Sequence, residues 1–93
     1  MILPSKMKFS LGQVVITANA LQTLNADDVL TALNRHVTGD WGDLDPEDRQ
    51  ENESALLHGG RLLSAYCDRA GVKFWIITES DRSATTTLLP EDY

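Results

Sequence analysis

The sequence predicts a two-layer α+β domain, in which two helices pack on an antiparallel sheet of three to four strands. Two observations lead to this class. The middle of the chain carries two helical segments, 26–37 and 45–58, each with start and stop signals. The last third carries three apolar segments joined by short polar turns, which predicts an antiparallel meander. A further strand over 9–17 is expected to join an edge of this sheet.

The chain is long enough for one domain. It has 93 residues, of which 42 % are hydrophobic and 24 % charged, an ordinary globular composition. We expect residues 1–8 to form a flexible leader and residues 9–93 to form the single domain. A chain of this size buries only about 60–65 % of its unfolded surface, so its core is thin and a deep enclosed active site is hard to build.

The N-terminal strand is predicted from the consecutive β-branched residues at 14–16, which suit a strand with both faces partly covered. A short helical turn follows, starting at Thr17 or Asn19 and ending at Leu24. The helix over 26–37 has Asn25 as N-cap and acids in its first turn. Its apolar stripe consists of Val29, Leu30, Leu33 and Val37.

The second long helix begins at a strong start signal. Asp45 is a good N-cap residue and Pro46 suits the first helical position. The helix is expected to run to His58 and to end at two glycines. Its first two turns hold no apolar residue, so we expect one end to stand in water. The docking end consists of Ala55, Leu56 and Leu57.

The three C-terminal strands are predicted over 61–67, 72–79 and 84–89. Residues 68–71 fit a type I turn, with Gly71 at a position that requires a positive φ. The strand over 72–79 is apolar on both faces, so it is expected to be central. Pro90 ends the last strand.

The acidic residues are concentrated in one segment. Residues 40–53 contain seven of the 14 acids and a single base, so they carry the whole formal net charge of −6. These acids are Asp40, Asp43, Asp45, Glu47, Asp48, Glu51 and Glu53. One interpretation is a solvated helix start, with Asp45 paired to Arg49 at the i, i+4 spacing. The other is an electrostatic binding face, because seven acids exceed what capping needs.

Trp41 lies on a glycine-bordered loop inside this acidic segment. Such an aromatic is either a plug over the core or an anchor for a partner. The predicted partner-binding residues are Asp40, Trp41, Asp43, Asp45, Glu47, Asp48 and Glu51. A calcium site at Asp43 and Asp45 lacks the later ligands of an EF-hand, so neither a metal nor a cofactor is predicted.

Other polar residues have ordinary structural interpretations. His36 and His58 each fall near a helix C-terminus, where a cation is favourable, and Cys67 is expected to be a small core residue. Arg82 lies in a hydroxyl-rich segment without a phosphate-binding glycine loop, so a hairpin turn is favoured over a phosphate site. The basic residues that could share one sheet face are Arg61, Arg69, Lys73 and Arg82.

Composition also indicates the cellular compartment of the protein and the classes of molecule that it can bind. The single cysteine excludes an intrachain disulfide, and the longest apolar runs are far shorter than the ~20 residues that span a bilayer. We therefore expect a cytoplasmic protein with no membrane partner. The excess of acids argues against direct nucleic-acid binding, which needs a basic surface.

Several strings along residues 8–93 carry a resemblance to a known family. They include the run from Gly39 to Asp48, the run from Gly60 to Tyr66, Trp75 to Glu79 and the closing Leu88 to Tyr93. In these the chain resembles a family of small uncharacterised bacterial proteins associated with plasmids and other mobile genetic elements. The resemblance implies an accessory protein of mobile DNA, and brings no catalytic residue with it. Small acidic proteins of that kind often antagonise host defence by imitating DNA, which is an analogy.

The sequence therefore predicts a non-enzymatic interaction protein, with residues 40–53 binding a basic protein surface as a DNA mimic or as an adaptor. A DNA-binding or host-defence protein is the expected partner. The alternative is a small regulatory or ligand-sensing domain that forms a homo-oligomer, such as a homodimer, through an unpaired edge strand. An enzyme would need a cleft at the end of the helix over 26–37, lined by His36, Trp41 and the acidic residues, and no residue spacing supports a named reaction.

Overall fold

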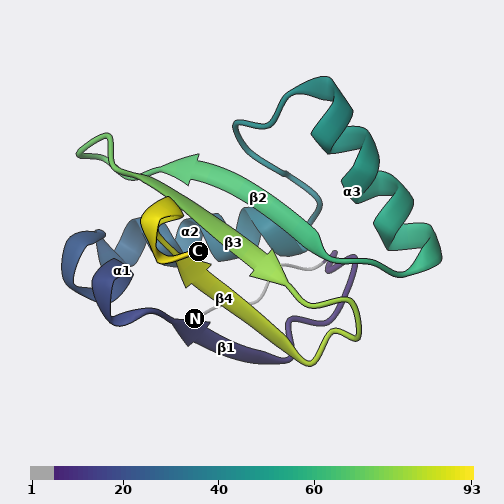
Figure 1. The fold of residues 1–93 in the computed structure, drawn as a ribbon, viewed down its shortest axis with the longest axis horizontal. Coiled ribbons are helices and arrows are strands. Elements are labelled where there is room, and N and C mark those ends of the chain that lie inside the picture. Colours follow the sequence, from purple (N-terminus) through teal and green to yellow (C-terminus); the bar gives the residue numbers. More distant parts are fainter. Residues whose placement is uncertain (1–5) are drawn as a thin grey trace.

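The computed structural model describes residues 6–93 and confirms an α+β fold (Figure 1). The elements in chain order are β1 (Gln13–Ile16), α1 (Ala18–Thr23), α2 (Ala26–Val37), α3 (Pro46–His58), β2 (Leu62–Cys67), β3 (Lys73–Thr78), β4 (Ala84–Leu88) and a 3-10 turn, η1 (Pro90–Asp92). Both long helices and all three C-terminal strands lie where the sequence predicts them, to within one or two residues.

The sheet has the strand order β1-β4-β3-β2, so β3 and β4 are central. β2 pairs antiparallel with β3, and β3 pairs antiparallel with β4, which confirms the meander. The predicted turn between β2 and β3 is also confirmed. The Gly71 N–H donates to the Asp68 carbonyl at 2.8 Å, and Gly71 has a φ of 82°.

The first strand joins the edge of the sheet as expected, but it differs from the prediction in three ways. β1 runs parallel to β4, because the chain leaves β1 through helices rather than through a hairpin. It has only four residues, and it begins beside Gly12, where a Cβ would lie 2.4 Å from the Arg82 carbonyl oxygen. Val14 and Val15 are 47 % and 41 % exposed, so the expected cover on both faces is wrong.

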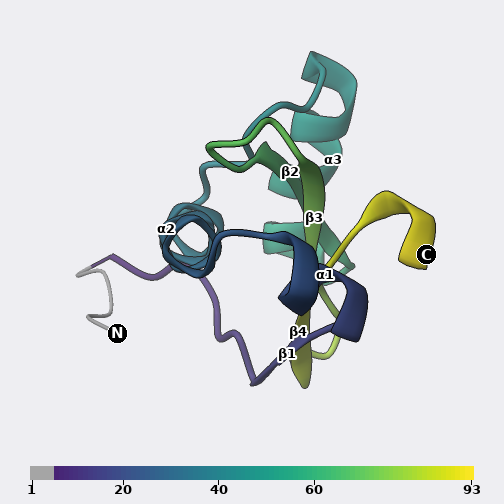
Figure 2. The same cartoon turned by 90° about the vertical axis from the view of Figure 1, so that its left-hand side faces the viewer.

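Helix α2 covers one face of the sheet (Figure 2). Asn25 caps it by accepting from the Asp28 N–H at 3.2 Å, as predicted. Three residues of its predicted stripe are buried, but Leu30 is 42 % exposed, so the buried stripe is narrower than expected. The main core cluster contains Val29, Ala32, Leu33, Tyr66, Phe74, Ile76 and Leu89.

The opposite face carries the C-terminus. The ring of Tyr93 packs edge-on against Trp75, with 5.9 Å between the ring centroids. The Asp92 carboxylate accepts from the Thr17 hydroxyl at 2.7 Å and from the Asn19 amide at 3.0 Å. η1 is therefore tied to the start of α1, where Thr17 is the N-cap.

Part of the predicted leader is described. The Lys8 N–H donates to the Val37 carbonyl at 2.8 Å, and Phe9 packs edge-on against the His36 ring. Residues 1–5 of the predicted leader lie outside the described residues. Within residues 6–93, no helix combines the length and the apolar character needed to cross a membrane.

Candidate functional site: an acidic face on helix α3

Helix α3 is attached to the sheet mainly by polar contacts, since the predicted docking residues Ala55 and Leu56 are only half-buried. Leu57 is 81 % exposed, whereas Asn52, in the middle of the helix, is buried. The Asn52 amide donates to the Leu63 carbonyl at 2.7 Å and accepts from the Leu63 N–H at 3.1 Å. One side chain therefore satisfies both backbone groups of a β2 residue, and it fixes α3 beside that strand.

The C-terminal end of α3 is held by Arg82. Its guanidinium donates to the carbonyls of Gly60 at 2.6 Å and Ala55 at 3.2 Å, besides the Glu79 carbonyl at 3.1 Å. The donors that a phosphate would need are thus used on backbone carbonyls, including one from the last turn of α3. The favoured interpretation of the Arg82 segment as a turn agrees with these contacts.

The loop before α3 pairs with the outer edge of β2. The Asp43 N–H donates to the Ala65 carbonyl at 2.7 Å, and the Ala65 N–H donates to the Trp41 carbonyl at 3.2 Å. Gly42 is required between them, since a Cβ there would lie 2.0 Å from the Ala65 oxygen. Together with Asn52, this loop closes the β2 edge of the sheet.

Trp41 is a plug over the core. Its side chain is only 5 % exposed, and its indole N–H donates to the Glu53 carboxylate at 2.7 Å. The ring stacks on Phe9 and meets His36 edge-on. The predicted role of Trp41 as a surface anchor is therefore not compatible with this conformation.

Three of the seven acids are engaged within the fold. The Arg35 guanidinium donates to both oxygens of Asp40, at 2.8 and 3.2 Å, and these bonds lower the pKa of the Asp40 carboxyl. Asp45 caps α3 by accepting from the Asp48 N–H at 2.8 Å. Glu53 binds the Trp41 indole.

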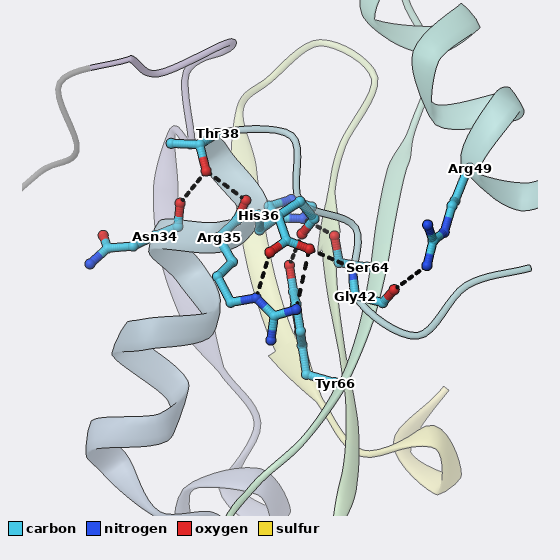
Figure 3. A network of polar contacts seen from close by, with 9 residues as sticks. Asn34, Arg35, His36, Thr38, Gly42, Arg49, Ser64 and Tyr66 are labelled. Atoms are coloured by element: carbon cyan, nitrogen blue, oxygen red, sulfur yellow. Dashed lines mark hydrogen bonds and ion pairs between the residues drawn. The ribbon is translucent and has the colours of Figure 1, made fainter.

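The predicted Asp45–Arg49 pair does not form. The Arg49 guanidinium instead donates to the Gly42 carbonyl at 3.1 Å (Figure 3). It also donates to the Leu44 carbonyl at 3.0 Å. Arg49 therefore stabilises the loop before α3. It does not neutralise a carboxylate of the acidic segment.

The other four acids form the surface that we call the acidic face. They are Asp43, Glu47, Asp48 and Glu51, and all four are exposed. Among residues 6–93, none of these carboxylates makes an ion pair within 4 Å. The sequence segment thus separates into acids that hold the fold and acids that face solvent.

A groove lies beside the acidic face, between the start of α3 and the outer surface of β2 and β3. It encloses about 380 Å³, with Asp43 and Asp48 among its walls and Trp75 on its sheet side. A smaller hollow of about 180 Å³ shares Leu44, Asp48 and Leu63 with it and reaches Glu51. Apolar side chains therefore border three of the four carboxylates, while Lys73 lines the larger groove on β3.

His36 belongs to a buried polar chain rather than to a charged helix cap. Its Nδ1 lies 2.5 Å from the Ser64 hydroxyl and its Nε2 lies 2.9 Å from the Thr78 hydroxyl. The Thr78 and Thr85 hydroxyls are 2.7 Å apart, and the Thr85 hydroxyl donates to the Leu11 carbonyl. Because the Thr85 hydroxyl donates its only proton to Leu11, it must accept from the Thr78 hydroxyl. The Thr78 hydroxyl in turn accepts from the Nε2–H of His36.

The Nε2 of His36 therefore carries a proton, and in the neutral ring that burial favours, Nδ1 accepts from the Ser64 hydroxyl. Burial, with a smaller contribution from the charge of Arg82, lowers the pKa of His36 from 6.5 to about 3. His36, Ser64 and Thr78 are each fully buried, so the serine–histidine pair presents no nucleophile at the surface. The expected capping role of a charged His36 is wrong.

Two other expectations need correction. Cys67 is exposed at the end of β2, rather than buried in the core. The basic residues do not gather into one patch, since Arg69 pairs with Asp28 at 3.0 Å and Arg82 binds backbone carbonyls. Arg61 lies beside Glu79 and Tyr93.

Replacing Asp45 with alanine should destabilise the protein by about 1 kcal/mol, because the first turn of α3 loses its cap. The matched replacement of Asp43 should change stability by less than about 0.5 kcal/mol, as expected for an exposed side chain. Urea denaturation of both variants measures the difference. Equal losses would contradict the division between structural and solvent-facing acids.

No metal site is found among the described residues, since no group of three or more His, Cys, Asp or Glu side chains in 6–93 is placed to hold an ion. Comparisons with protein-family models, with curated proteins and with solved structures find no match to this chain.

Proposed function

We propose that the protein is a non-enzymatic interaction module whose acidic face binds a basic surface of a partner protein. The observation that carries the proposal is the set of four solvent-facing carboxylates, Asp43, Glu47, Asp48 and Glu51, beside an apolar groove. The fold uses the side chains of the other acids of the segment for capping and pairing, whereas these four make no ion pair within residues 6–93. Only Glu47 and Asp48 lie in the first turn of α3, where acids favour the helix dipole. Like charges held close together on the start of α3 and on the loop before it repel each other, and a basic partner relieves that repulsion.

The groove between the start of α3 and strands β2 and β3 can accommodate a long amphipathic side chain of the partner. Lysine and arginine carry a long aliphatic stem and a charged head. The stem would pack on Leu44, Leu63 and Trp75, while the head would meet Asp43 or Asp48. This arrangement moves the proposed apolar anchor from Trp41 to the groove.

The resemblance to proteins of mobile genetic elements makes DNA-binding and host-defence proteins the first partners to test. Their DNA-binding surfaces are basic, so an acidic module competes with DNA for them. In the narrower form of the proposal, the protein is a DNA mimic, and DNA then displaces it from its partner. In the adaptor form, the partner binds DNA and the protein at the same time.

Capture from a host lysate with two charge variants tests the proposal. The face variant carries Asp43→Asn, Glu47→Gln, Asp48→Asn and Glu51→Gln. The control variant carries Asp27→Asn, Glu79→Gln, Asp81→Asn and Glu91→Gln, which lie outside the segment. Both change the net charge from −6 to −2, so the two variants are matched in total charge. The control variant also removes the Arg61–Glu79 ion pair and the Asp81 carboxylate that accepts from the Ser83 N–H, so far-UV circular dichroism verifies its fold.

Wild type and the control variant should retain a DNA-binding or host-defence protein that the face variant loses. The retained amount should fall between about 0.1 M salt, where the Debye length is about 10 Å, and about 1 M salt, where it is about 3 Å. Equal capture by both variants would mean that the four carboxylates are a solvated helix start and nothing more.

A further inference from the structure

The sheet has one closed edge and one open edge. Asn52 and the loop through Gly42 occupy the backbone groups of β2 at Leu63 and Ala65. At the other border, no helix or strand of residues 6–93 lies beyond β1 (Figure 1). Edge strands are commonly protected by proline, by charged side chains or by bulges, and β1 (Gln-Val-Val-Ile) has neither proline nor charge.

The open backbone groups of β1 can be assigned. The N–H groups of Gln13 and Thr17 donate to the β4 side, to Ser83 and Thr87, both at 3.0 Å. Because successive residues of a strand point their backbone groups to opposite sides, Val15 also faces β4. Val14 and Ile16 therefore direct their N–H and C=O groups away from the sheet.

An apolar groove of about 290 Å³ runs beside this edge, between β1, α1 and α2. Of the seven large hydrophobic side chains exposed within residues 6–93, four line it. These are Val14, Val15, Leu21 and Leu30. None of the lining residues is charged.

The charge distribution points to a second copy as the occupant. Residues 9–26, which include β1 and α1, contain no charged residue and no histidine. The acidic face lies beside β2, at the opposite border of the sheet. For a chain with a net charge of −6, self-association costs least where the acidic face is distant, and the β1 border meets that condition. The Asp92 carboxylate at the end of β1 is held by its bonds from Thr17 and Asn19.

We propose that two copies associate through their β1 edges, with antiparallel β1 strands joining the two sheets about a two-fold axis. The outward groups of Val14 and Ile16 then define the register. Val14 of one copy exchanges both backbone hydrogen bonds with Ile16 of the other, and the two Val15 residues face each other on the axis. The dimer carries its two acidic faces at opposite ends, which offers two binding sites to a partner.

Cross-linking tests this register. In a Cys67→Ser background, Val15→Cys places two thiols at a non-hydrogen-bonded pair with about 4.5 Å between Cα atoms, which suits a disulfide. The control is Gln13→Cys, on the same strand and the same face. Its two copies would lie roughly 14 Å apart along the antiparallel strands, beyond the reach of a disulfide.

The expected result is rapid oxidation of the Val15→Cys protein to a covalent dimer and little or none for Gln13→Cys. Equal cross-linking of the two variants, or none of either, would overturn the register. Because neither variant removes a contact with β4, both are expected to fold, and far-UV circular dichroism verifies this.

Sedimentation equilibrium tests the association itself. Wild type should form dimers at high micromolar concentration. Val14→Pro, which removes only an outward N–H, should weaken the dimer at least tenfold, whereas Leu57→Lys on α3 should leave it unchanged. Wild type that stays monomeric would overturn the proposal, and an apolar dye bound by that monomer would assign the groove to a small ligand instead. Neither result bears on capture by the acidic face.

Discussion

The free energy of unfolding should fall by about 2 kcal/mol between about pH 7.5 and about pH 5, and His36→Gln should lose most of this dependence. The pKa of His36 is about 3 in the folded protein and 6.5 when exposed. Between these values the unfolded chain binds a proton that the folded chain excludes. Stability is therefore fully present above pH 6.5 and declines by up to about 1.4 kcal/mol per pH unit below it.

Glutamine at position 36 offers an oxygen to Ser64 and an amide N–H to Thr78, so the variant is expected to fold with a loss of about 1–3 kcal/mol at neutral pH. His58, which is exposed, provides the control, and His58→Gln should keep the wild-type pH dependence. Urea denaturation at several pH values measures all three proteins. The aspartates with lowered pKa, including Asp40, lose their contribution only at more acidic pH. A His36→Gln profile parallel to that of wild type would contradict the neutral buried histidine.

Replacing Asn52 with alanine should destabilise the protein by about 2–3 kcal/mol, because two hydrogen bonds are lost and the backbone groups of Leu63 are left without them. The amide protons of Leu63 and Ala65 should exchange faster as α3 separates from the β2 edge. Urea denaturation and hydrogen exchange by NMR measure the two effects. Ser54→Ala, exposed on the same helix, should change stability by less than about 0.5 kcal/mol. An unchanged exchange rate at Leu63 would show that α3 is held by other contacts.

The sequence predicted the elements well where local signals are strong. The caps at Asn25 and Asp45 and the turn at 68–71 are short-range features, and each lies where expected. The direction of β1 depends on contacts with a strand about seventy residues later, for which no local signal exists. Its exposure was missed for the same reason, since a β-branched run is equally compatible with a central strand and with an uncovered edge.

The candidate site was predicted in outline only. The concentration of acids is visible in the sequence, but the division between structural and solvent-facing acids depends on which residue reaches Arg35, the Trp41 indole or a helix N–H. The sequence does not predict that Asn52 docks, because a helix usually attaches to a sheet through its apolar residues. A single asparagine among charged residues of a helix only weakly indicates that its side chain binds the backbone of an edge strand, as Asn52 does at Leu63. The groove beside Trp75 could not be foreseen, because residues from α3, β2 and β3 form it.

The buried hydrogen bonds of His36 could not be predicted from the sequence either. His36 lies in the last turn of α2, where a charged cap is the usual expectation. Its partners Ser64 and Thr78 come from two different strands, and each is an ordinary polar residue in a predicted strand. Only the packing of α2 on the sheet brings the three side chains together, and that packing makes the histidine neutral.

The central claim, that a basic partner binds the acidic face and its groove, is tested most directly through the two tryptophan indole N–H signals in the NMR spectrum. Titration with an arginine-rich peptide should shift the Trp75 indole signal together with the amides of Asp43 and Asp48. The Trp41 signal should remain in place, because that indole is buried against Glu53. The face variant should show no shift, and the control variant should respond as wild type does. A shift of the Trp41 indole without one at Trp75, or equal shifts in both variants, would contradict the account.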